Sequence, residues 1–173
     1  ELVQQISYTH TKKILGGQIS VVFYDVTTLY FEIDQEDGLR KTGFSKEGKH
    51  QNPQIVLGLL VSKNGYPLAY DIFEGNKFEG HTMLPVLDSF KEKYNLDQMV
   101  IIADSGLLSN TNIKELESGG YEFILGARIK NEKRYIQRKI LSLKLKNTES
   151  AVVEKGNLKL IVSYSDNRAK KDL

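Results

Sequence analysis

The order of the apolar segments constrains the fold of this chain more than any other feature. Three segments rich in β-branched and aromatic residues come first, at 19–31, 55–61 and 68–73. The second and third flank Asn64-Gly65, a pair typical of tight hairpin turns. We expect an antiparallel meander of three strands, with 19–31 as a long and largely buried strand because its apolar residues alternate little with polar ones.

A helix is predicted next. Thr82 is a typical N-cap residue and Pro85 falls in the first turn. The apolar residues that follow at helical spacing are Met83, Leu84, Leu87, Phe90 and Tyr94. We expect this apolar face to pack on the sheet.

The rest of the chain predicts a strand at 100–103, a helix from Ser109 to Gly119-Gly120, and a strand at 123–125. A strand–helix–strand order favours parallel pairing. Residues 132–145 are ambiguous, whereas 151–153 and 158–164 predict a further hairpin. The fold class is therefore α/β, with a mixed sheet built from a three-strand antiparallel meander and then strand–helix–strand.

The length of 173 residues and the hydrophobic content of 40% fit one core of ordinary size. We expect a single domain over 1–173. No secretion signal, no bilayer-spanning apolar run and no cysteine are present, so a cytoplasmic location and no membrane partner are expected. The chain begins at Glu1 without a Met and ends in a charged stretch at Asp172-Leu173, which indicates a piece of a longer protein.

Asp25 lies inside an apolar strand segment, where an unpaired carboxylate costs several kcal/mol if it is buried. It either bonds a nearby backbone group or lysine, or it serves a site. Asp104 directly follows the strand at 100–103, at the edge where open α/β sheets place ligands, although starting a turn or capping a helix is its ordinary alternative. If the two strands are neighbours, both carboxylates can reach one divalent metal. Oxygen ligands of this kind select Mg²⁺ or Mn²⁺, which support phosphodiester chemistry.

Positive charge is concentrated in one segment, although the whole chain has a formal net charge of only +2. Residues 128–146 contain eight basic residues and one acidic residue, Glu132. The segment is either a solvated helix face beside a polar loop or a surface that contacts phosphates. Arg128 and Lys130 are the favoured phosphate contacts within it.

The segment YDVTTLYFE at residues 24–32 resembles the first-aspartate motif of insertion-sequence transposases of the DDE class, in the group that shares a Tyr-Arg-Glu-Lys signature. Further blocks are similar to those enzymes and occur in the same order: GFSK at 43–46, GYPL at 65–68, DIFEGN at 71–76, ADSGLLS at 103–109 and YEFILGAR at 121–128. The similarity runs from 18 to 130, which we take as the core, and continues more weakly to the end. Asp25 and Asp104 match the first and second Asp of the family.

The resemblance implies an RNase H-like catalytic core that nicks the ends of a DNA element and joins them to target DNA, with Mg²⁺ or Mn²⁺ as cofactor. It also implies a homodimer acting on paired ends and a bacterial, nucleoid-associated location. The family's third carboxylate, a helical Glu, is missing: Tyr135 and Arg138 match the start of its pattern, but Ser142 stands where Glu should follow. The hairpin at 150–165 is then the start of an inserted β segment, with the Glu beyond Leu173. We expect this chain alone to bind metal poorly and to lack strand-transfer activity.

Two other functions remain open at this point. A different RNase H-like nuclease would need its remaining carboxylates within this chain. A domesticated transposase segment would act only as a DNA-binding or interaction module. The other acidic residues near strand ends, and His81 before the helix, are assigned no catalytic role; they are Glu32, Asp34, Asp71 and Glu74.

Overall fold

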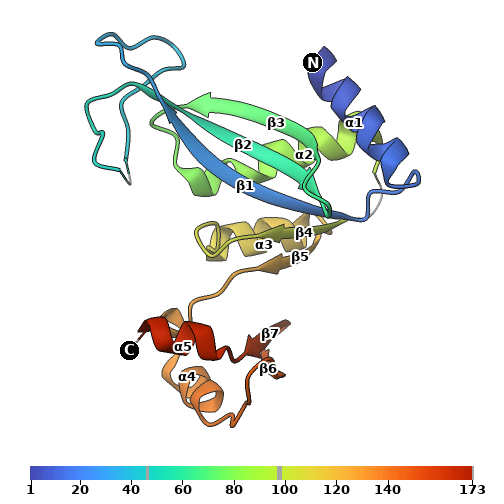
Figure 1. Cartoon of the computed structure of the whole chain (residues 1–173), viewed down its shortest axis with the longest axis vertical. Coiled ribbons are helices and arrows are strands. Elements are labelled where there is room, and N and C mark those ends of the chain that lie inside the picture. The colour runs from blue at the N-terminus through green and yellow to red at the C-terminus, as the bar shows by residue number, and fades with distance from the viewer. Residues whose placement is uncertain (46, 97–98, 173) are drawn as a thin grey trace. The chain divides into compact units, whose positions relative to one another are not determined.

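A computed structural model of the chain describes residues 1–45, 47–96 and 99–172. For Asp172 it describes the backbone only. Lys46, part of one motif block, and Leu173 therefore lie outside the described residues. The chain forms two compact units, Glu1–Ala127 and Arg128–Leu173 (Figure 1). The predicted core ended at 130, close to this boundary, and the assignment of a single catalytic domain stays a prediction.

The first unit is built on a five-stranded sheet with the strand order β3-β2-β1-β4-β5. The strands are β1 (Val21–Tyr30), β2 (Gln54–Ser62), β3 (Pro67–Glu74), β4 (Val100–Ala103) and β5 (Glu122–Leu125). Strands β1, β2 and β3 form an antiparallel meander, while β4 pairs parallel with β1 and with β5. The predicted meander and the predicted parallel pairing are both confirmed.

Three helices complete the first unit: α1 (Leu2–Ile14), α2 (Met83–Tyr94) and α3 (Asn110–Ser118), with the short 3-10 helix η1 (Glu79–His81) before α2. Their buried side chains share one hydrophobic core with the sheet. The predicted apolar face of α2 supplies Met83, Leu87 and Phe90 to this core. Ser109 caps α3 by accepting a hydrogen bond from the amide of Asn112 (3.0 Å), as predicted.

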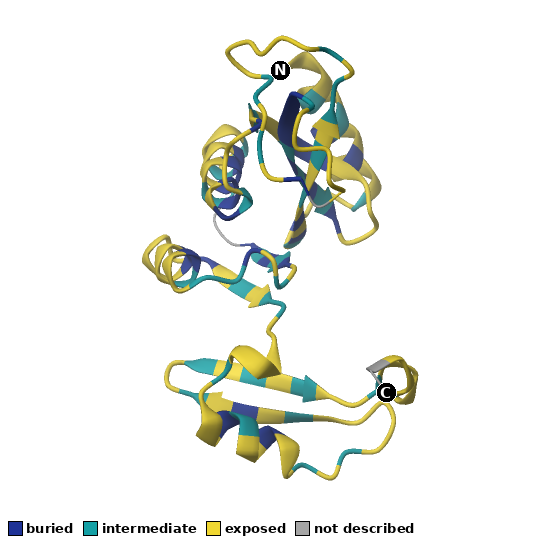
Figure 2. Cartoon of the chain, turned by 90° about the vertical axis from the view of Figure 1, so that its left-hand side faces the viewer, coloured by how far each residue is buried: buried dark blue, intermediate teal, exposed yellow. Residues whose placement is uncertain are grey.

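The prediction that β1 is largely buried is wrong. Its residues alternate, with Val22 and Tyr24 buried and Phe23 and Asp25 exposed. The reason is that the core lies on one face of the sheet, so alternate residues of β1 point away from it. Figure 2 shows this contrast of buried and exposed positions along the strands.

Helix α1, which the sequence did not predict, lies along the edge strand β3. Its Gln4 donates a hydrogen bond to the carbonyl of Tyr70 (2.6 Å), and Ser7 donates one to the carbonyl of Pro67 (2.6 Å). Tyr8 stacks on Tyr94 of α2 with ring centroids 3.6 Å apart. Side-chain donors thus engage carbonyls of a strand that would otherwise present an open edge.

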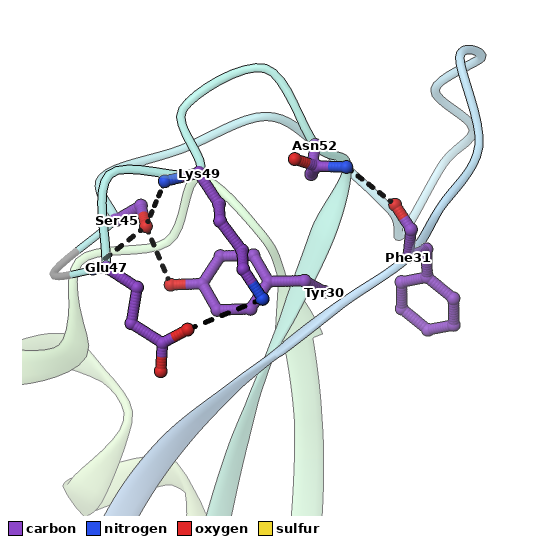
Figure 3. A network of polar contacts seen from close by, with 6 residues as sticks. All are labelled: Tyr30, Phe31, Ser45, Glu47, Lys49 and Asn52. Atoms are coloured by element: carbon purple, nitrogen blue, oxygen red, sulfur yellow. Dashed lines mark hydrogen bonds and ion pairs between the residues drawn. The ribbon is translucent and has the colours of Figure 1, made fainter.

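The long loop between β1 and β2 is tied to the end of β1 by a polar network (Figure 3). Buried Ser45 lies 3.0 Å from the Tyr30 hydroxyl and accepts hydrogen bonds from the amides of Glu47 (3.2 Å) and Lys49 (2.9 Å). The Lys49 ammonium group lies over the Tyr30 ring, 5.1 Å from its centroid. This places the GFSK block in a structural role, because Ser45 holds the loop on the strand that carries Asp25.

The second unit contains the 3-10 helix η2 (Ile129–Asn131), α4 (Arg134–Leu141), an antiparallel hairpin of β6 (Ser150–Lys155) and β7 (Leu158–Ser163), and α5 (Asp166–Asp172). The predicted hairpin is confirmed, and the ambiguous segment 132–145 is helical from Arg134 to Leu141 only. A small separate core joins Ile136 and Ile140 of α4 to Val153 of β6. In the described part of the chain, no helix combines the length and apolar composition that crossing a bilayer requires.

Candidate metal site on two parallel strands

Asp25 and Asp104 are brought together by the pairing of β1 with β4. The last paired residues in the parallel register are Tyr24 and Ala103, and each aspartate is the next residue along its strand. Neighbouring strands lie about 4.8 Å apart. The two carboxylates are exposed and line the same pocket, which has a volume of about 610 Å³.

One oxygen of each carboxylate is held by a nearby backbone amide. Asp25 Oδ1 accepts a hydrogen bond from the amide of Val26 (2.8 Å), and Asp104 Oδ1 accepts one from the amide of Gly106 (2.7 Å). The local roles considered for these residues are therefore real. For neither Oδ2 atom is a hydrogen bond seen within the described part of the chain, so each aspartate keeps an oxygen available to a ligand.

The donor set fits a hard divalent cation, because two exposed carboxylates share one pocket and both retain an unengaged oxygen. Among the described residues, no group of three or more Asp, Glu or His side chains is close enough to hold a metal ion. Ser142, where the family pattern requires Glu, ends α4 and donates its hydroxyl to the carbonyl of Lys139 (2.8 Å). The site as described thus offers two carboxylates.

Tyr24 fixes β1 from the buried side, directly before Asp25. Its hydroxyl donates a hydrogen bond to Thr82 Oγ1 (2.7 Å), and the Thr82 hydroxyl donates to the carbonyl of Glu79 (2.6 Å). Burial raises the pKa of Tyr24 to about 12, with the hydrogen bond to Thr82 lowering it and the charges of Asp71, Asp25 and Glu79 raising it. The residue therefore stays neutral and anchors the strand to the start of α2.

This contact corrects the role predicted for Thr82. Thr82 occupies the N-cap position of α2, but its side chain makes no capping hydrogen bond. The hydroxyl is used instead between Tyr24 and Glu79. Gly58 on β2 makes the arrangement possible, since a Cβ there would lie 2.3 Å from the Tyr24 hydroxyl oxygen.

Asp104 is supported from the side by the end of β5. The amide of Gly126 donates a hydrogen bond to the carbonyl of Ala103 (3.0 Å). A Cβ on Gly126 would lie 2.7 Å from the amide nitrogen of Ser105. Glycine is therefore required where β5 passes the turn that presents Asp104.

The pocket also contains residues that sequence reasoning missed. Lys63, in the turn between β2 and β3, lines it together with Phe23 of β1, whose side chain is 36% exposed. Lys63 follows Ser62, the β2 partner of Val22 in the sheet. The sequence predicted a turn at Asn64-Gly65. Only the strand order shows that this turn and the two aspartates line the same pocket.

The other candidates lie apart from the carboxylate pair. Glu32, Asp34, Asp71 and Glu74 are exposed and do not line its pocket. His81 packs edge-on against Phe78, with ring centroids 5.3 Å apart. Arg128 and Lys130 are exposed and belong to the second unit.

Several solved structures match this chain, and the first of them shares its fold. A piggyBac transposase in a synaptic complex with hairpin DNA matches 93% of this chain with a TM-score of 0.51 and 14% identity, over 36% of its own length. A Mos1 transposase paired-end complex matches 71% of this chain (TM-score 0.41, 11% identity, 42% of its own length). A pre-cleavage Mos1 transpososome matches 99% (TM-score 0.42, 11% identity, 54% of its own length).

The chain thus spans between a third and just over half of the length of these transposases. The first unit has the mixed sheet expected from the order of its elements and the RNase H-like fold that the resemblance implied. The search of curated proteins returned no match. A family model described as the transposase DDE domain matches residues 16–171, nearly the whole chain, and the chain therefore belongs to the DDE transposase domain family.

Proposed function

We propose that this chain carries part of the catalytic core of an insertion-sequence transposase and that Asp25 and Asp104 are two of its metal-binding carboxylates. The observation that carries the proposal is the parallel register of β1 and β4, which makes both aspartates the next residue after a paired position. The family match supports a metal-binding role for these two residues.

DDE transposases use divalent metal ions, and Mg²⁺ or Mn²⁺ is the proposed cofactor here. When bound, such ions activate the attacking water or hydroxyl and stabilise the leaving oxygen. Asp25 and Asp104 would hold the ion through their carboxylate oxygens. The proposed reaction is nicking of DNA at the element ends and transfer of the strands to target DNA.

The proposed partners are transposon-end and target DNA, with Arg128 and Lys130 as phosphate contacts, and a second copy of the whole protein in a bacterial cytoplasm. The similar piggyBac transposase was solved in a complex with hairpin DNA, which supports DNA as the ligand. The family pattern includes a third carboxylate, a helical Glu, which we propose is contributed by another part of the whole protein. The chain by itself is then expected to show no strand transfer, and a nicking assay with Mn²⁺ checks this.

Metal binding is the sharpest test, because paramagnetic Mn²⁺ broadens the amide signals of residues near it. We expect titration of the ¹⁵N-labelled chain to broaden Val26 and Gly106 first, at millimolar concentrations of Mn²⁺. The Asp25→Asn and Asp104→Asn variants should each lose this local broadening. Asp34→Asn, which removes an exposed carboxylate outside the pocket, is the matched control and should behave like the unmodified chain.

The proposal fails if broadening is centred elsewhere in the chain, or if it persists unchanged in both site variants. An alternative in which the segment only binds DNA predicts no metal-dependent cleavage even after the complete protein is restored. The family match favours a transposase over other RNase H-like nucleases.

A further inference from the structure

The boundary between the two units divides the charge of the chain. Residues 128–173 contain 13 Lys and Arg against 5 Asp and Glu, a formal charge of +8. Residues 1–127 contain 11 Lys and Arg against 17 Asp and Glu, a formal charge of −6. The net charge of +2 for the whole chain is therefore the sum of a strongly basic second unit and an acidic first unit.

Within the second unit, α4 has a buried side and a basic side. Ile136 and Ile140 pack against Val153 of the hairpin. Arg134 and Arg138, one helical turn apart, are exposed, as are Lys139 and Tyr135, which is 62% exposed. Figure 2 shows the buried residues of this helix facing the two strands and its exposed residues facing away. We call these four exposed residues the outer face of α4.

The charges of this outer face are not neutralised within the fold. Glu132 is the one acidic residue among 128–146, and its carboxylate is engaged by Lys155, with Nζ 2.8 Å and 2.9 Å from the two oxygens. In the described parts of the second unit, no carboxylate forms an ion pair with Arg134, Arg138 or Lys139. Like charges one turn apart on a helix repel each other, so this arrangement stabilises nothing inside the protein.

We propose that the outer face of α4 binds the sugar–phosphate backbone of duplex DNA. Arg134 and Arg138 can each donate paired hydrogen bonds to phosphate oxygens, Lys139 adds a third positive charge, and the Tyr135 hydroxyl adds a donor. Contacts of this kind position a duplex without reading its sequence. The choice of DNA among polyanions rests on the proposed function, whereas the surface itself is set by the charge distribution and by the packing of α4.

The test compares two triple variants of the whole chain that change the charge equally. The first is Arg134→Gln, Arg138→Gln and Lys139→Gln; glutamine keeps a helix propensity close to that of the residues it replaces. The control is Lys13→Gln, Lys77→Gln and Lys114→Gln, three exposed residues of the first unit. Binding to a duplex of arbitrary sequence is measured by fluorescence anisotropy in EDTA over a series of NaCl concentrations.

We expect the α4 variant to bind at least about tenfold more weakly at about 100 mM NaCl, because three phosphate contacts are lost. The slope of log K against log salt should become shallower by about 3. The control variant should keep its affinity within about twofold and should keep its slope. Circular dichroism of both variants checks that the fold is retained, and Arg134→Lys with Arg138→Lys, which preserves charge, should restore most of the binding.

Several results would overturn the proposal: unchanged binding by the α4 variant, an equal loss in both triple variants, or tighter binding to phosphatidylserine vesicles or single-stranded RNA than to duplex DNA. Because the assay contains EDTA, it is independent of the metal site. The Asp104→Asn chain should bind DNA like the unmodified chain. A failed metal-binding test therefore leaves this inference standing, and a failed DNA-binding test leaves the metal site standing.

Discussion

Two adjacent residues on opposite faces of β1 have different roles at the site. Asp25 faces the pocket, while its neighbour Tyr24 points into the core and ends on Thr82. Successive side chains of a strand point to opposite faces of the sheet. Tyr24 can therefore be buried while the next residue, Asp25, stays exposed. The position of Asp25 therefore depends on Tyr24, which is buried in the core.

Tyr24→Phe should destabilise the fold by about 1 kcal/mol at neutral pH, the usual net contribution of one hydrogen bond. Burial raises the pKa of Tyr24 from its ordinary value of 10.0 to about 12 in the folded protein. Tyrosine ionises first in the unfolded chain, so stability is fully present below pH 10 and is lost as the pH rises toward 12. Tyr24→Phe removes this part of the pH dependence.

Urea unfolding at several pH values between neutrality and pH 11 measures the effect, with Tyr66→Phe in the exposed hairpin turn as the control. The difference in unfolding free energy between the unmodified chain and Tyr24→Phe should shrink above pH 10. A difference that stays constant with pH would show that Tyr24 does not carry the effect.

At the scale of elements, the end of β5 acts as a support for the end of β4. Gly126 touches the turn after Asp104 so closely that no side chain fits. The support is backbone against backbone, with the hydrogen bond to Ala103 beside it. The presentation of Asp104 therefore depends on a strand that contributes no functional side chain.

Gly126→Ala should destabilise the first unit by about 1–3 kcal/mol, the typical cost of forcing extra atoms into a packed region. It should also weaken Mn²⁺ broadening at Gly106, since the turn must move. Gly38→Ala, where an added Cβ meets no atom within 4 Å, is the control and should change neither quantity. Unaltered stability and metal binding in Gly126→Ala would contradict the supporting role of β5.

Elements with strong local signals were predictable, and elements made by tertiary contacts were not. The Asn64-Gly65 turn and the strand–helix–strand order predicted the sheet and allowed Asp25 and Asp104 to lie on neighbouring strands, with Asp25 in the middle of β1 and Asp104 directly after β4. Helix α1 was missed because it lacks a side-chain cap and contains several β-branched residues, and its position comes from contacts with β3. Lys63 was missed because its place in the pocket follows from strand order.

At the scale of the whole molecule, each unit has its own hydrophobic core. The second core is small, with three buried residues at its centre. Small cores supply little stability, so the second unit should unfold at a lower free energy than the first. The acidic unit contains Asp25 and Asp104, and the basic unit contains the outer face of α4.

Ile136→Ala should destabilise the second unit selectively, by about 2–4 kcal/mol, because it empties the centre of that core. Native-state hydrogen exchange resolves the two units. Amides of β6 and β7 should exchange faster in the variant, while those of β1 and β2 keep their protection. Equal loss of protection in both units would mean that they fold as one cooperative structure.

The pairing of β1 with β4 has a consequence for how such a site can change over time. Because the backbone ladder sets the separation of Asp25 and Asp104, substitutions among surrounding side chains leave that spacing intact. An insertion or deletion of one residue in β4 before Asp104 is different, since it would turn the second carboxylate toward the helix-covered side. The spacing of the two carboxylates thus tolerates side-chain substitutions around the site but not a change in the length of β4.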